Sequence, residues 1–135
     1  MPLPIRYASE PNLSVEDFAK VLKSSTLAER RPVDDTARLE AMLRNADIII
    51  TARAGNDIVG VSRAITDYAF CCYLSDLAVD EKFQKQGIGK KLIEETHQKA
   101  GLQTSLYLTS APAAINYYPK IGMPSYPCFG IPRSR

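Results

Sequence analysis

The fold of this chain is decided by residues 79–93, which read Val-Asp-Glu-Lys-Phe-Gln-Lys-Gln-Gly-Ile-Gly-Lys-Lys-Leu-Ile. A strand-like apolar run leads into a basic loop, two glycines follow, and apolar residues at helical spacing begin at Ile88. The backbone N–H groups in the first turn of a helix have no partners within the helix and lie at the positive end of its dipole. Because glycine has no Cβ, an anion can approach the main chain closely there. The stretch therefore predicts a site for a phosphorylated ligand, surrounded by Lys82, Lys85, Lys90 and Lys91.

Two common phosphate-binding loops are excluded by position. A P-loop requires a glycine, four residues and then Gly-Lys-Ser/Thr. Here Gln84 replaces the first glycine, and Lys91 replaces the hydroxyl that binds Mg²⁺. A dinucleotide-binding loop requires a third glycine, at the position that Leu92 occupies. Both the P-loop and the dinucleotide-binding loop therefore lack a residue that their phosphate binding requires.

The motif that does fit is Gln/Arg-x-x-Gly-x-Gly/Ala, formed by Gln84, Gly87 and Gly89. It resembles the pyrophosphate-binding loop of the GNAT superfamily, the acyl-CoA-dependent N-acetyltransferases. A second match, Ala-Ile-Asn-Tyr-Tyr-Pro-Lys-Ile-Gly-Met at 114–123, resembles the later helix of that family, which usually ends in Tyr-x-x-x-Gly-Phe. Residues 77–79 look like the family's central strand. The resemblance extends over most of the chain from about residue 47 onward.

The resemblance implies one domain over residues 1–135, a mixed α/β fold of the GNAT type with a central mixed sheet flanked by helices. Local signals agree with this fold. Strands are predicted at 5–8, 47–53, 57–66, 71–79 and around 106–108, with one or two irregular strands in the proline-rich segment 123–135. Helices are predicted after Ser14, after Asp34-Asp35, from Ile88 to Gly101 and after Pro112. The predicted order is β-α-α-β-β-β-α-β-α-β.

The resemblance also implies that acetyl-CoA is the co-substrate. The N–H groups of residues 86–89 would donate to its pyrophosphate, and the backbone of Leu77 and Val79 would pair with its pantetheine arm as an added strand would. The residues predicted to bind it are Leu77, Ala78, Val79, Gln84, Lys85, Gln86, Gly87, Ile88, Gly89 and Lys90.

Two residues are candidates for the chemistry. Tyr118 matches the position that in many family members protonates the coenzyme A thiolate, and a phenol with a pKa of about 10 lies close enough to a thiol of about 8.5 to do so. Asp76, by simple strand alternation, shares a face with Leu74 and Ala78, against apolar surface. Such burial makes a carboxylate a better base. The alternatives are a core role for Tyr118 and a loop hydrogen bond for Asp76, while Tyr117 is expected only to pack.

The composition narrows the class of protein. A formal net charge of +2 over 135 residues does not favour nucleic-acid binding. No apolar run approaches the roughly 20 residues of a membrane span, and the first residues do not resemble a secretion signal. The three cysteines, two of them adjacent, form a poor disulfide framework and favour the reducing cytoplasm. No Cys/His spacing indicates a metal site.

The leading hypothesis is an N-acetyltransferase that modifies a primary amine, with a small molecule favoured over a protein. The acceptor would lie between the first two helices and the loop before the central strand, lined by Arg30, Arg31, Asp67 and Tyr68. A non-catalytic module that binds acyl-CoA and a nucleotide-binding protein remain as alternatives. Both a monomer and a homodimer are compatible with the sequence.

Overall fold

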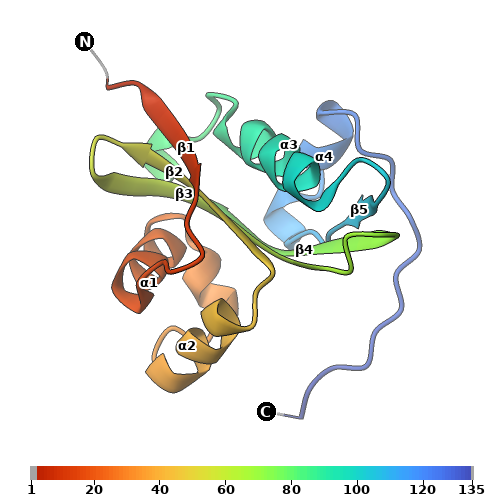
Figure 1. Cartoon of the computed structure of the whole chain (residues 1–135), viewed down its shortest axis with the longest axis horizontal. Coiled ribbons are helices and arrows are strands. Elements are labelled where there is room, and N and C mark those ends of the chain that lie inside the picture. Colours follow the sequence, from red (N-terminus) through yellow and green to blue (C-terminus); the bar gives the residue numbers. More distant parts are fainter. Residues whose placement is uncertain (1–2, 135) are drawn as a thin grey trace.

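The computed structural model describes residues 3–134, and these form one five-stranded sheet with helices on both faces (Figure 1). The strands lie in the order β1 (Ile5–Ser9), β2 (Ile48–Ala54), β3 (Asp57–Thr66), β4 (Cys71–Val79) and β5 (Ser105–Tyr107). The pairs β1–β2, β2–β3 and β3–β4 are antiparallel, and β5 is parallel to β4. The predicted mixed α/β fold with a mixed central sheet is confirmed.

The helices divide between the two faces of the sheet (Figure 1). One face carries α1 (Val15–Ser24) and α2 (Thr36–Arg44), and the other carries α3 (Ile88–Ala100). The one-turn helix α4 (Tyr117–Lys120) follows β5, and residues 3–134 also contain the 3-10 helices η1 (Leu27–Arg30), η2 (Glu81–Phe83) and η3 (Pro112–Ala114).

The helix starts and the hairpin arise from local chemistry, as predicted. Ser14 caps α1, since its Oγ accepts a hydrogen bond from the N–H of Asp17 at 3.1 Å. Asp35 caps α2 in the same way, accepting from the N–H of Arg38 at 3.0 Å. Gly55 takes the positive φ of 63° that the turn between β2 and β3 requires.

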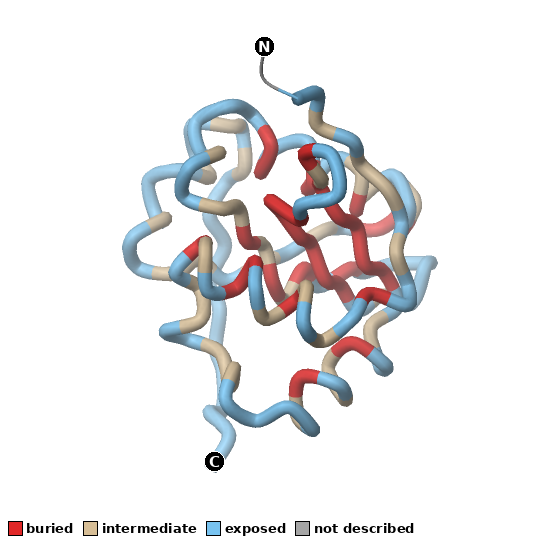
Figure 2. The backbone as a smooth tube through the Cα atoms, turned by 90° about the vertical axis from the view of Figure 1, so that its left-hand side faces the viewer, coloured by how far each residue is buried: buried red, intermediate tan, exposed pale blue. Residues whose placement is uncertain are grey.

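Two apolar layers, one on each face of the sheet, form the core, which Figure 2 shows as the buried strands at the centre of the molecule. The layer under α1 and α2 includes Phe18, Leu22 and Leu39, each at most 1% exposed. The layer under α3 includes Ile48, Ile88 and Leu92. Full burial of one such side chain contributes about 1.5–3 kcal/mol to stability.

A β-bulge in β4 changes which side chains face which layer. Arg63 pairs with Asp76 but Ala64 pairs with Leu74, so the residue between them, Ser75, is inserted without a partner. Simple alternation would place Cys72 and Ala78 on the same face. In the structure Cys72 packs in the α3 layer and Ala78 in the α1–α2 layer. The facing predicted for Asp76 from alternation with Leu74 is therefore wrong.

The C-terminal third differs from the prediction in two ways. The predicted helix over 114–123 is divided into η3 and α4, and α4 tolerates Pro119 because residues of a first turn need no N–H donor. Residues 123–134 contain no strand, although one or two were predicted. Pro124, Pro127 and Pro132 lack the N–H that a strand ladder requires.

Among residues 3–134, no helix is long and apolar enough to cross a membrane.

Candidate functional site

An open edge of β4 forms the first part of the site. β5 pairs with β4 only over Cys71–Tyr73, and beyond Tyr73 no strand among the described residues pairs with that edge. The hydroxyls of Tyr73 and Thr109 are 3.1 Å apart where the two strands begin to separate. The second half of β4 therefore has main-chain groups available to an extended ligand.

The direction of these groups follows from the hydrogen bonds of neighbouring residues. The N–H of Asp80 donates to the carbonyl of Val59 in β3 at 2.8 Å. Because the direction of the backbone groups alternates along an antiparallel strand, the N–H and C=O groups of the even-numbered residues at this end of β4 point toward β3. The carbonyls of Ser75 and Val79 instead accept from the side chains of Arg31 and Gln84 on the other side. The N–H and C=O of Leu77 thus point toward the open edge.

Ala78 does not fit the predicted binding role. Its backbone belongs to the set that faces β3, where Ala78 pairs with Val61, and its side chain is buried in the α1–α2 layer. It has no group to offer a ligand at the open edge.

The loop after β4 is held in an unusual backbone conformation. The amide of Gln84 donates to the carbonyl of Val79 at 3.0 Å, which fixes the start of the loop to the end of the strand. Lys85 and Gly87 have positive φ values of 65° and 84°. A Cβ at Gly87 would meet no atom within 4 Å, so the backbone conformation, and not the space, favours glycine there.

The first turn of α3 has three backbone N–H groups that make no hydrogen bond within the helix. The first such bond runs from the N–H of Lys91 to the carbonyl of Gly87 at 3.1 Å. The N–H groups of Ile88, Gly89 and Lys90 lie before it. They lie where the sequence predicts an anion site, and the predicted residues 84–90 lie together at the end of β4.

Tyr117, which the sequence indicated only as a packing residue, reaches this helix terminus. Its hydroxyl accepts a hydrogen bond from the N–H of Lys90. A Cβ built on Gly89 would lie only 2.9 Å from the Tyr117 hydroxyl oxygen, so a larger residue there would displace the end of the Tyr117 side chain. The adjacent tyrosine pair was the only sequence signal.

Tyr118 lies beside Tyr117, with their rings edge to face and the centroids 5.2 Å apart. Burial raises the pKa of the Tyr118 phenol above its usual value of 10.0, and the neighbouring Tyr117 adds to the effect. Tyr118 is therefore protonated at neutral pH and can donate a hydrogen bond or a proton.

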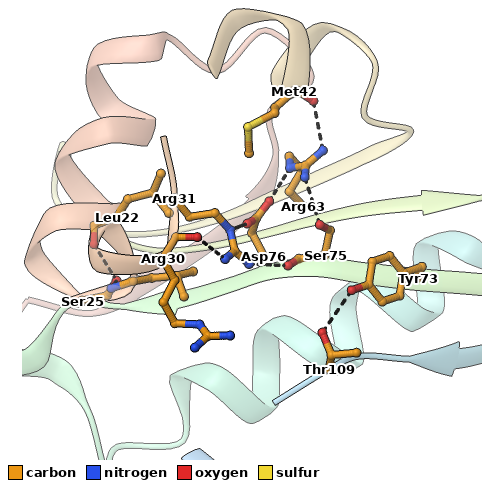
Figure 3. A network of polar contacts seen from close by, with 11 residues as sticks. Leu22, Ser25, Arg30, Arg31, Met42, Arg63, Tyr73, Ser75, Asp76 and Thr109 are labelled. Atoms are coloured by element: carbon orange, nitrogen blue, oxygen red, sulfur yellow. Dashed lines mark hydrogen bonds and ion pairs between the residues drawn. The ribbon is translucent and has the colours of Figure 1, made fainter. Parts of the chain in front are cut away.

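Asp76 lies on the opposite face from α3, at the centre of a polar network (Figure 3). It is fully buried, and its two carboxylate oxygens accept from Nε of Arg31 and Nε of Arg63. Both guanidinium groups also bond to the bulge residue: Arg31 donates to the carbonyl of Ser75 at 2.9 Å, and Arg63 donates to its hydroxyl at 3.0 Å.

The prediction that Asp76 lies against apolar surface is therefore wrong, while its role as the base stays a prediction. Two guanidinium groups occupy its oxygens, and Asp76 is not among the residues that line the neighbouring cavity. Its contacts indicate that it fixes the two arginines and the bulge in place.

That cavity, of about 700 Å³, lies beside the network and is bounded by the α1–α2 connection, β4 and the C-terminal segment. Arg30 and Arg31 line it, as predicted, and Glu29 is a carboxylate at its wall. Asp67 and Tyr68, also predicted to line it, do not. The Asp67 carboxylate instead accepts from three backbone N–H groups of its own turn, which lowers its pKa to about 2, and the Tyr68 hydroxyl donates to the carbonyl of Asp47.

Comparison with known proteins agrees with this geometry. Residues 15–123 match the model of the family described as Acetyltransferase (GNAT) family. The chain is 31% identical over 102 residues to the chloroplastic GCN5-related N-acetyltransferase 1 of Arabidopsis thaliana, covering 71% of this chain and 51% of that protein. It is 35% identical over 77 residues to the histone acetyltransferase TAP1 of Glycine max, covering 49% of this chain but only 32% of the relative.

The fold has a counterpart among solved structures. A probable acetyltransferase of Staphylococcus aureus superposes with a TM-score of 0.79 at 20% identity, covering 98% of this chain and 100% of the other.

Proposed function

Since the chain belongs to the Acetyltransferase (GNAT) family, we propose that it transfers an acetyl group from acetyl-CoA to a primary amine of a small molecule. The observation that carries this proposal is the juxtaposition of an open β4 edge at Leu77 with three amides at the start of α3 that make no hydrogen bond within the helix. An extended ligand with a pyrophosphate at one end requires both features.

The residues present fit coenzyme A. The amides of Ile88, Gly89 and Lys90 can donate to a pyrophosphate, and the space over Gly87 lets it approach the main chain. Leu77 offers one N–H and one C=O to an extended amide-containing arm. The residues named from the sequence keep this role in the proposal, with Ala78 left out and Gln84 holding the loop in shape.

Acetyl-CoA supplies the acetyl group as a thioester: a C–N bond to the amine forms, the C–S bond breaks, the amine loses one proton and the departing sulfur gains one. Tyr118 would provide the proton for the sulfur, since its raised pKa keeps the phenol protonated. Glu29 and solvent at the cavity are the groups available to accept the proton from the amine.

Ligand preference tests the cofactor assignment. Calorimetric titration with coenzyme A, ATP and NAD is expected to show the tightest binding for coenzyme A, because only this ligand offers both a pyrophosphate and an extended arm for the β4 edge. Equal affinity for all three would contradict the assignment and favour a general nucleotide-binding protein.

Replacing Gly87 with alanine is expected to weaken coenzyme A binding by roughly tenfold or more. A non-glycine residue at this left-handed φ is strained by about 1–2 kcal/mol, and relief of that strain would turn the loop amides away from the ligand. Gly55→Ala is the matched control, because Gly55 also has positive φ but lies in the distant hairpin turn. Titration should show unchanged affinity for Gly55→Ala, and an equal loss in both variants would contradict the site.

Replacing Tyr117 with phenylalanine is expected to tighten coenzyme A binding a few-fold, in contrast to the weaker binding expected for Gly87→Ala. The hydroxyl of Tyr117 must leave the N–H of Lys90 before a phosphate can accept from it, and a net hydrogen bond is worth about 1 kcal/mol. Tyr126→Phe serves as the control, since Tyr126 packs on Tyr107 at a ring distance of 5.8 Å. Weaker binding by Tyr117→Phe would mean that the hydroxyl contacts the ligand itself.

We expect a single catalytic domain over residues 1–135 that works in the cytoplasm as a monomer or homodimer, without a metal, a nucleic acid or a membrane as partner. The three cysteines are free, which suits a reducing compartment.

A further inference from the structure

The cavity beside the Asp76 network is lined by an excess of positive charge. Among the described residues, its wall includes the arginines at 30, 31, 38, 63 and 133, and Glu29 is the acidic residue among them. Asp76, behind the wall, offsets part of the charge of Arg31 and Arg63. Even with both carboxylates counted, the arginines remain in excess, so an anion entering the cavity is attracted.

The cavity also lies where an acceptor must reach the acetyl group. Tyr73, Ser75 and Thr109 form part of its wall. Tyr73 is the last residue of β4 that pairs with β5, and Ser75 is the bulge residue at the start of the open edge. A molecule in the cavity therefore lies next to the β4 edge that is proposed to hold the arm of acetyl-CoA.

The arginines differ in how far they are already engaged. Arg31 and Arg63 are fixed by Asp76 and Ser75, so their positions are preorganised and their charges only partly balanced. Arg30 contributes its carbonyl to Arg31 at 2.9 Å, while no hydrogen bond among residues 3–134 engages its guanidinium. Arg30 thus has all of its donors available to a ligand, in a geometry that suits carboxylate or phosphate.

We propose that the acceptor is a primary amine that also carries a carboxylate or phosphate group, and that Arg30 is the principal residue binding this group. The assignment rests on the proposed acetyl transfer and specifies its substrate class. Positive surroundings also favour the neutral, nucleophilic form of an amine over its ammonium form. The same arginines would repel an amine that carries several positive charges.

Matched pairs of amines test this substrate class. Thiol release from acetyl-CoA is measured with amino acids beside their decarboxylated amines, with amino sugar phosphates beside the free amino sugars, and with the polycation kanamycin. We expect kcat/KM to be about tenfold or more higher for the acidic member of a pair, since a hydrogen bond to a charged group is worth more than a neutral one. If the amino acids are the better substrates, the acidic group recognised is a carboxylate; if the amino sugar phosphates are, it is a phosphate.

The variant Arg30→Ala is expected to reduce the preference for the acidic member by about tenfold, through a rise in KM with little change in kcat. Arg44→Ala is the matched control: Arg44 is an exposed α2 residue whose weak contact to Glu40 is 3.9 Å long, and it does not line the cavity. It should leave the preference unchanged.

The possible outcomes distinguish a failure of the acidic acceptor from a failure of acetyl transfer itself. Preference for the neutral member or for kanamycin, or an unchanged preference in Arg30→Ala, overturns the acidic acceptor and leaves acetyl transfer standing. Absence of thiol release above hydrolysis with every amine overturns the proposed transfer, and the acidic acceptor with it.

Discussion

Replacing Tyr118 with phenylalanine is expected to lower kcat by about 10²–10⁴-fold, the usual contribution of a positioned general acid. The substitution removes one oxygen and keeps the ring, so the edge-to-face contact with Tyr117 at 5.2 Å is preserved. The departing thiolate then lacks its proton donor, while the loop at residues 84–90 is untouched. Steady-state thiol release measures the effect on catalysis, and titration with coenzyme A measures the effect on binding. We expect kcat to fall and the affinity for coenzyme A to stay unchanged.

The pH profile adds a second observable for Tyr118. Because burial raises its pKa above 10.0, the phenol remains protonated as the pH rises through neutrality, and activity should decline only in the strongly alkaline range as the proton is lost. This decline should be missing from Tyr118→Phe and present in the control Tyr126→Phe. A fall in kcat of less than about tenfold would exclude Tyr118 as the general acid and favour a non-catalytic acyl-CoA-binding module.

Replacing Asp76 with asparagine is expected to destabilise the protein by about 3–5 kcal/mol, the range found when one partner of a buried ion pair is removed. The side-chain volume is nearly unchanged, so the loss of stability reports the two charges left without their counterion: that of Arg63, which is buried, and that of Arg31, whose side chain is 22% exposed. For a domain of this length the melting temperature should fall by roughly 10 °C or more. Thermal unfolding followed by circular dichroism measures it.

Asp57→Asn provides the matched control for Asp76. Asp57 also pairs with a cation, Lys20 at 3.4 Å, but both side chains are largely exposed, and such pairs contribute about 0–1 kcal/mol. If Asp76→Asn instead unfolds at the temperature of the unchanged protein and loses only its activity, Asp76 is the base after all and its structural role is refuted.

The sequence predicted those parts of the fold that depend on local chemistry. The helices that begin after Ser14 and Asp35 and the two strands that flank Gly55 were found as predicted, and the caps and the turn each have one short-range cause. The conformation of the loop before α3 was also predictable, because a glycine directly before an amphipathic helix is a local signal.

The residues around β4 were harder to predict because their placement depends on partners distant in sequence. One inserted residue, Ser75, reverses the alternation of the strand, and no local signal marks it. Asp76 then meets Arg31, which is 45 residues away in sequence. Tyr117 likewise meets Lys90, which belongs to a different helix, so the spacing within its own helix does not reveal the contact.

Acetyl transfer from acetyl-CoA to an amine can be followed by mass spectrometry of the amine after incubation with the protein, with thiol release measured in the same sample. We expect an amine bearing an acidic group to gain the mass of one acetyl group, with one thiol released for each amide formed. Thiol released without any acetylated amine, or coenzyme A bound with no turnover of any amine, would contradict it.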